Sequence, residues 1–166
     1  LRISGPVTVS SGHFEIFKLQ APTTISATEK VTFMAEGASS SAAGSNVTIP
    51  FNTPTEDSHG GWNSTNKDWT VPHSGTYKIT CAARLTFTGP SVNQYMDVII
   101  QIDGATKREF VKYLESTGVA GLSGIVSYQA PLLAGQKIRG VLDTNLATPV
   151  MTTGTTHTYL EIIRVK

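Results

Sequence analysis

The 166-residue chain has a single cysteine, Cys81, so no disulfide can form within it. Charged residues are also few, at 15% of the sequence with a formal net charge of +1. The longest basic run is the pair Lys107-Arg108. Because nucleic-acid-binding proteins concentrate positive charge on one face, this composition argues against a nucleic-acid partner.

Long apolar runs are missing as well. No apolar run is longer than three residues, as in Val98-Ile99-Ile100, whereas a helix that crosses a bilayer needs roughly 20 apolar residues. The sequence therefore predicts no membrane insertion. The chain starts at Leu1 without a methionine or a basic-then-apolar leader, which favours a fragment or a processed product of a longer polypeptide.

The chain does contain one long alternating pattern after a turn. Pro72, Ser74 and Gly75 are turn formers. One face of the pattern that follows is apolar and consists of Tyr77, Ile79, Cys81, Ala83, Leu85 and Phe87. The other face is mostly polar and includes Lys78, Thr80, Arg84 and Thr86. We expect residues 76–87 to form the central strand of an antiparallel sheet, with Cys81 as a buried, inert thiol.

Short strand patterns recur along the rest of the chain, with almost nothing helical between them. The predicted strands are 14–19, 31–35, 47–51, 69–71, 76–87, 93–102, 106–114, 122–130, 136–142 and 156–165. Ten short strands separated by turns predict an all-β sandwich or barrel. A chain of this length buries one ordinary core, so we expect one domain over residues 31–166. Residues 1–30 are then an N-terminal extension, which serves as a shaft-proximal linker, an added edge strand, or both.

Two details of the strands can be specified further. Asp103-Gly104 predicts a hairpin turn between two long strands. In the first of those strands, we place Tyr95, Val98, Ile100 and Ile102 in one apolar set. The last strand is also more apolar than a solvated strand needs, with Tyr159, Ile162 and Ile163. We expect both strands to contribute to the core and to a trimer axis.

The order of these motifs resembles the C1q-like globular head, a member of the tumour-necrosis-factor-like jelly-roll superfamily. The matching segments are IPFNTPTEDSHGGWN, DWTVPHSGTYKITCAARL, MDVIIQIDG, PLLAGQKIRGVLD and THTYLEIIRV. The resemblance covers roughly residues 31–166. It implies a ten-stranded antiparallel jelly-roll β-sandwich, and superfamily members typically close three protomers about an axis, so a homotrimer is expected.

More narrowly, the segments FEIFKLQAPTTISATEKV and DSHGGWN are similar to C-terminal domains of tailed-bacteriophage structural proteins, including tail and head fibres. The insertion around Trp62, before Trp69, departs from that pattern. The resemblance implies an extracellular virion protein at the fibre or capsid surface, joined to the remainder of the fibre or virion. It implies a host-surface polysaccharide or protein as the partner.

Exposed aromatic side chains in loops are a common means of binding sugars or proteins. Trp62, with Asn63 and Asn66, is the best candidate for such a site, followed by Tyr95 and Tyr113. The alternative for Trp62 is that its ring packs beneath its own loop.

No catalytic constellation is visible, so we expect no enzyme activity and no organic cofactor. The histidines, His13, His59, His73 and His157, lack metal-ligand spacing. Asp57 is better explained as the cap of a turn than as the partner of His59, and Glu56 beside it points the opposite way in a strand.

Calcium is the metal for which one loop offers oxygen ligands, at Asn63, Asn66 and Asp68. Their spacing does not match a complete calcium loop, and an ordinary turn-rich loop is the alternative.

Our first hypothesis is a trimeric fibre head that binds a host-surface receptor through loops 52–68, 88–93 and 144–155, at the end distal to the N-terminus. Three weak sites on one head gain avidity without any strong single site. The alternatives are a capsid head-fibre, decoration or trimerisation domain without a specific ligand, and a secreted C1q/TNF-like ligand.

Overall fold

The computed structural model describes residues 30–38, 44–154 and 156–165, and these contain strands and no helix. The strands are β1 (Thr32–Glu36), β2 (Gly44–Thr48), β3 (Glu56–Asp57), β4 (Trp62–Asn63), β5 (Asp68–Thr70), β6 (Gly75–Thr86), β7 (Tyr95–Ile102), β8 (Ala105–Tyr113), β9 (Gly121–Leu132), β10 (Lys137–Thr144), β11 (Val150–Met151) and β12 (Tyr159–Arg164). None of the described segments is a helix long and apolar enough to cross a membrane.

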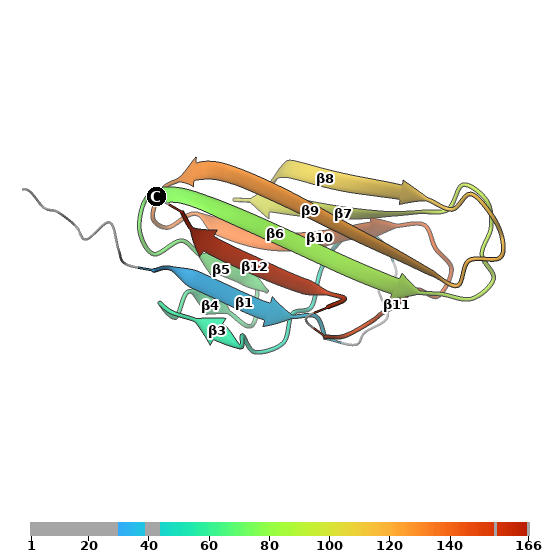
Figure 1. Ribbon diagram of the computed structural model, residues 1–166, viewed down its shortest axis with the longest axis horizontal. Coiled ribbons are helices and arrows are strands. Elements are labelled where there is room, and N and C mark those ends of the chain that lie inside the picture. The colour runs from blue at the N-terminus through green and yellow to red at the C-terminus, as the bar shows by residue number, and fades with distance from the viewer. Residues whose placement is uncertain (1–29, 39–43, 155, 166) are drawn as a thin grey trace, which may run out of the picture.

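The strands form two antiparallel sheets packed face to face (Figure 1). The front sheet has the order β9-β6-β12-β1-β3, with β11 beside the end of β6 that β12 does not reach. The back sheet has the order β4-β5-β10-β7-β8, with β2 also beside β10. This arrangement is the predicted all-β jelly-roll sandwich, and it leaves one outer face on each sheet for contacts with other molecules.

Strand β6 is the centre of the front sheet. It pairs with β9 along its whole length and with β12 and β11 on its other side. The predicted apolar face is confirmed, because the side chains of Tyr77, Ile79, Cys81, Ala83, Leu85 and Phe87 are all buried in the core. Burial raises the pKa of the Cys81 thiol to about 12, so the thiolate needed for reaction is absent near neutral pH.

The other predicted features fall into three groups. The Asp103-Gly104 hairpin turn is confirmed, with positive φ angles of 51° and 79° joining β7 to β8. Strand 14–19 and the boundary near residue 30 lie at or outside the limit of the described residues and stay predictions. The other nine predicted strands each overlap an observed strand, although 47–51 is shifted to Gly44–Thr48, and Phe51 instead bridges Gly37.

The grouping of Tyr95 with Val98, Ile100 and Ile102 is wrong. Side chains alternate along a strand, so Tyr95 lies on the opposite face of β7 from the other three. Val98, Ile100 and Ile102 belong to the core, whereas Tyr95 is half-buried on the outer face of the back sheet.

Asp57 fixes the turn that leads from β3 to β4, and its predicted role as a capping carboxylate is confirmed. Its Oδ1 accepts from the N–H of Gly61 at 3.1 Å, and its Oδ2 accepts from the N–H of Trp62 at 3.0 Å. The indole Nε1 of Trp69 also donates to Oδ1, at 3.1 Å. One carboxylate therefore ties the turn to the largest buried side chain of the core.

We predict that Gly140→Ala destabilises the domain by about 1–3 kcal/mol, because overpacking forces rigid core groups apart. A methyl at this position of β10 lies 2.7 Å from Sγ of Cys81 and 3.2 Å from the ring of Phe51. Chemical denaturation measures the loss. Gly118→Ala is the matched control, since nothing lies within 4 Å of its added methyl, and equal stability of the two variants would contradict this packing.

We predict that Asp57→Ala lowers the free energy of unfolding by about 2–3 kcal/mol, because it leaves two backbone amides and a buried indole N–H without their charged acceptor. Urea denaturation followed by tryptophan fluorescence measures the change. A loss below about 0.5 kcal/mol would show that water replaces the carboxylate and that the turn does not depend on it.

Candidate interaction surfaces

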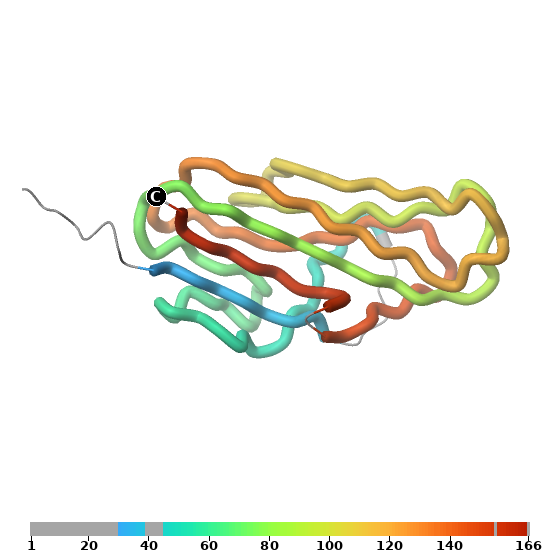
Figure 2. The backbone as a smooth tube through the Cα atoms, viewed as in Figure 1, coloured from blue at the N-terminus to red at the C-terminus, as the bar shows by residue number. Residues whose placement is uncertain are grey.

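Strands β8 and β9 form the open long edge of the sandwich. Within the described residues each pairs with one neighbour only, β8 with β7 and β9 with β6, and the two run side by side along the top in Figures 1 and 2. Large apolar side chains near this edge are exposed, with Phe110 at 40%, Val111 at 39% and Ile125 at 53%. Strand edges that lack a partner and have exposed apolar side chains beside them are typical of surfaces that another chain covers.

The two edge strands approach each other closely because Gly124 has no side chain. A methyl on Gly124 would lie 2.9 Å from Cδ1 of Phe110 and 3.0 Å from Cε of Met96. The Phe110 ring thus lies over the gap between the sheets. Apolar surface is therefore continuous from the core to the exposed edge.

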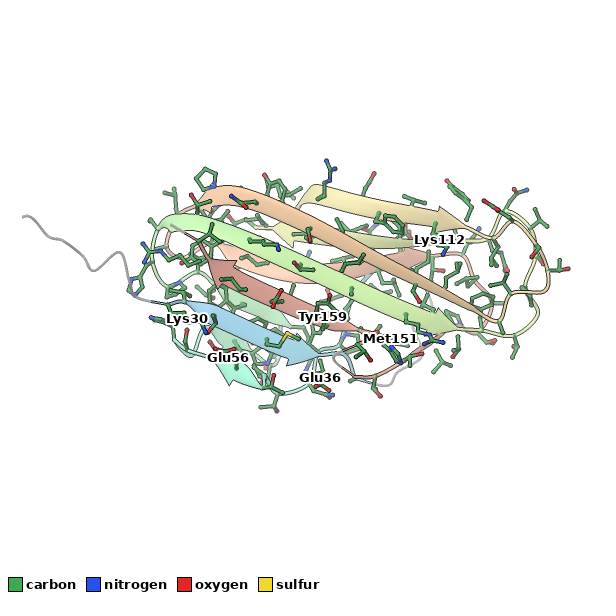
Figure 3. The ribbon with its side chains drawn as sticks, in the orientation of Figure 1. Lys30, Glu36, Glu56, Lys112, Met151 and Tyr159 are labelled. Carbon is green, nitrogen blue, oxygen red and sulfur yellow. The ribbon has the colours of Figure 1, made fainter. Side chains whose placement is uncertain are left out.

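A shallow depression of about 420 Å³ continues from this edge onto the outer face of the front sheet. Ala82 of β6 lies between the side chains of Ile125 on β9 and Tyr159 on β12, and all three line the depression. Figure 3 shows Tyr159 on this face, at the start of β12. Burial, followed by the charge of Glu161, raises the pKa of the Tyr159 phenol.

The rim of the same depression is polar. Arg84 Nη1 lies 3.5 Å from Nε2 of His157, and both side chains line the depression. We call the continuous surface of Tyr159, Ala82, Ile125 and Phe110 the association strip. The sequence points to Tyr159 alone among these residues, because alternation identifies the face of a strand but not which outer faces lie side by side.

The Trp62 side chain lies at the border of the core. Its ring centroid is 5.4 Å from that of Phe33 and 6.4 Å from that of Phe51, and the residue is half-buried. A ring held in this way presents less surface to a sugar than an exposed loop aromatic does. Its role in ligand binding stays a prediction.

The calcium candidates are only partly available as ligands. Oδ1 of Asn63 already accepts from the backbone amides of Thr65 and Asn66, each at 3.0 Å. Asp68 is buried, and its Oδ1 has no hydrogen-bond partner. No group of three or more His, Cys, Asp or Glu residues suited to a metal occurs in the described part of the chain, and calcium binding stays a prediction.

The three loops proposed for recognition do not share one end of the molecule. Loop 52–68 runs back along β1, from Asn52 beside Glu36 to Ser58 beside Thr32. Near the start of β1, Lys30 forms an ion pair with Glu56 at 3.9 Å (Figure 3). The loops after β6 and β10 meet at the far end, where the hydroxyls of Thr88 and Thr148 are 2.9 Å apart. Placing all three loops at the distal end is therefore wrong, because the chain turns back after β1.

Tyr95 and Tyr113 do come together. They are directly opposite each other on β7 and β8, with ring centroids 5.9 Å apart, and Tyr113 is 60% exposed. The Tyr95 hydroxyl lies 3.4 Å from Oδ2 of Asp143. Burial, and next the Asp143 charge, raises the pKa of Tyr95.

The fold also pairs two histidines that the sequence separates. The rings of His59 and His73 lie 5.3 Å apart in an edge-to-face arrangement, and Nδ1 of His59 is 2.7 Å from the Ser58 hydroxyl. No spacing signals this contact, because it arises from two loops that meet beside β1.

No protein-family model matches the sequence, and no curated protein sequence matches it. Solved structures do. The globular domain of zebrafish complement 1qA protein has a TM-score of 0.58 at 12% identity, over 82% of this chain and 98% of that one. Murine APRIL at pH 5.0 has a TM-score of 0.62 at 13% identity, over 82% and 100% of the two chains.

Eiger TNF from S. frugiperda has a TM-score of 0.62 at 11% identity, over 82% of this chain and 93% of that one. Sequence identities this low establish the fold alone. The chain therefore has the jelly-roll fold found in C1q and TNF-family proteins.

Proposed function

We propose that this chain forms the homotrimeric head of an extracellular, non-enzymatic binding protein, and that its place is the tip of a bacteriophage fibre that binds a host-surface receptor. The observation that carries the self-association is the association strip, where an open strand edge runs without interruption into an apolar depression. A monomer in water would leave this surface exposed at a cost of about 25 cal/mol for each Å².

We propose a ring in place of a two-fold dimer. The Phe110 end of the strip of one copy then packs against the Tyr159 end of the strip of the next copy, and such a heterologous contact closes into a ring when the rotation allows. The edge side chains of one copy fill the depression of the next copy. The C1q- and TNF-like fold supports three copies, as the sequence resemblance implies.

The fibre-tip role rests on the resemblance of FEIFKLQAPTTISATEKV and DSHGGWN to phage structural proteins. All of the first segment except Lys30 and Val31 lies outside the described residues. The second contains Asp57 and Trp62, and its turn is built around the Asp57 carboxylate. Receptor contacts belong to exposed loops of the head, and three copies of a weak site raise avidity by roughly 10²–10⁴.

A secreted C1q/TNF-like ligand is the second candidate, and the similarity to APRIL and to Eiger TNF favours it. Both candidates require the same trimer. They differ in the partner, so adsorption distinguishes them. A fibre head in soluble form competes with virions for host cells, and its loop variants at 88–93 and 144–154 compete less well. Unchanged competition by these variants would contradict recognition through those loops.

We predict that Ile125→Arg dissociates the trimer, because it places a charge in the apolar centre of the association strip. The expected loss is about 2–4 kcal/mol per contact, as at the centre of other interfaces. Sedimentation velocity at a fixed protein concentration measures it. Leu133→Arg is the matched control, since Leu133 is 68% exposed in the turn after β9 and outside the strip. Equal dissociation of both variants would contradict the location of the interface.

A further inference from the structure

Two aspartates face each other on the outer face of the back sheet. Asp97 of β7 is directly opposite Asp143 of β10, and like charges in that position destabilise a sheet. Glu109 of β8 is diagonal to Asp97, opposite Ile99. Asp97 is nevertheless only 8% exposed, so this carboxylate is held in a poorly solvated place beside two others.

Each of the two aspartates has one carboxylate oxygen that no described residue satisfies. Oδ1 of Asp97 and Oδ1 of Asp143 are both buried without a hydrogen-bond partner. Burial, and after it the charges of Glu109 and Asp143, raises the pKa of Asp97 to about 6, opposed only by the backbone N–H of Phe110. At neutral pH the Asp97 carboxyl is ionised, and this buried charge lowers the free energy of unfolding of the domain.

No basic side chain among those described here neutralises the group. Arg139 shares the face but lies opposite Gln101, and its Nε donates to Oε1 of Gln101 at 2.9 Å. Lys112 is opposite Met96 and therefore points to the other side of β8. The described residues therefore supply no counter-ion for this negative charge on the outer face of the back sheet.

Apolar and aromatic surface adjoins the carboxylates. Val111, opposite Asp97, is 39% exposed, and the Tyr95–Tyr113 pair lies immediately beyond it. Tyrosine faces attract cations, and the methylene stem of a lysine or arginine packs on such apolar surface while its charged end meets an acid. Both parts of a basic side chain therefore find a complementary surface.

We propose that Asp97, Asp143 and Glu109 form a binding site for a basic side chain, lysine or arginine, of a partner protein, with Tyr95 and Tyr113 against its aliphatic stem. The exposed Glu109 carboxylate makes the first contact. The incoming cation then displaces the Tyr95 hydroxyl from Asp143, a long contact of 3.4 Å, and reaches the two unpartnered oxygens. An organic cation fits better than a metal, because these residues do not form a three-ligand metal group.

This inference goes beyond the proposed function and does not depend on it. The site is on the outer face of the back sheet, whereas the association strip belongs to the front sheet and the open edge. A protein that proves monomeric would still offer the site, and a trimer would offer three.

The test is an NMR titration of the intact chain at pH 7.5 with N-acetyl-L-arginine amide, followed at the side-chain carboxyl carbons of Asp97 and Asp143 and at the ring protons of Tyr113. The neutral isostere N-acetyl-L-citrulline amide and calcium chloride are titrated in parallel. We expect saturable shifts with the arginine probe alone, with a Kd on the order of 1–10 mM. Affinity falls as the pH is lowered through about 6, where Asp97 becomes protonated.

Asp97→Asn/Asp143→Asn keeps the shape of the pair and removes its charges, so the double variant is expected to fold with equal or higher stability and to bind at least about tenfold more weakly. Glu109→Gln, at an exposed position, provides a second variant and is expected to weaken binding about threefold. Glu115→Gln, in the exposed loop after β8, is the control and retains full affinity. Undiminished binding by the double variant, equal binding of the citrulline probe, or saturable shifts with calcium in place of arginine would each overturn the proposal.

Discussion

The structure depends on the burial of one face of β6. This strand pairs on both sides for most of its length, and its inward side chains supply the middle of the core. Because alternate side chains of a strand must point apart, burying one face fixes the other as the outer surface of the front sheet. That outer surface, with Ala82 at its centre, is where the association strip lies.

The same constraint sets the limits of what the sequence predicts. The face of β6, the Asp103-Gly104 turn and the capping role of Asp57 are properties of a few consecutive residues, so composition and alternation are enough to find them. The short strands β3, β4 and β11 contain two residues each, too few for any periodic pattern. Tyr95 is separated from Val98 by an odd number of positions along β7, and side chains at such a spacing point to opposite faces of the sheet.

Contacts between segments that are distant in the chain could not be predicted from the sequence. The opposition of Asp97 to Asp143 follows from the pairing register of β7 with β10. The position of Tyr159 and Ile125 on either side of Ala82 follows from the order and register of β12, β6 and β9. Register and strand order are set by the whole core. The jelly-roll fold could therefore be assigned from the order of the sequence motifs. The two candidate surfaces could be located only in the structure.

The two candidate surfaces lie on different sheets of the domain. The front sheet and the open edge carry the apolar association strip, which we propose binds other copies of the chain. The back sheet carries Asp97 and Asp143 beside the Tyr95–Tyr113 pair. The central claim is self-association, and the most direct test is the molar mass of the intact chain by light scattering on a sizing column. The account predicts a mass near three times 17.7 kDa. A mass of 17.7 kDa at micromolar concentration would contradict it.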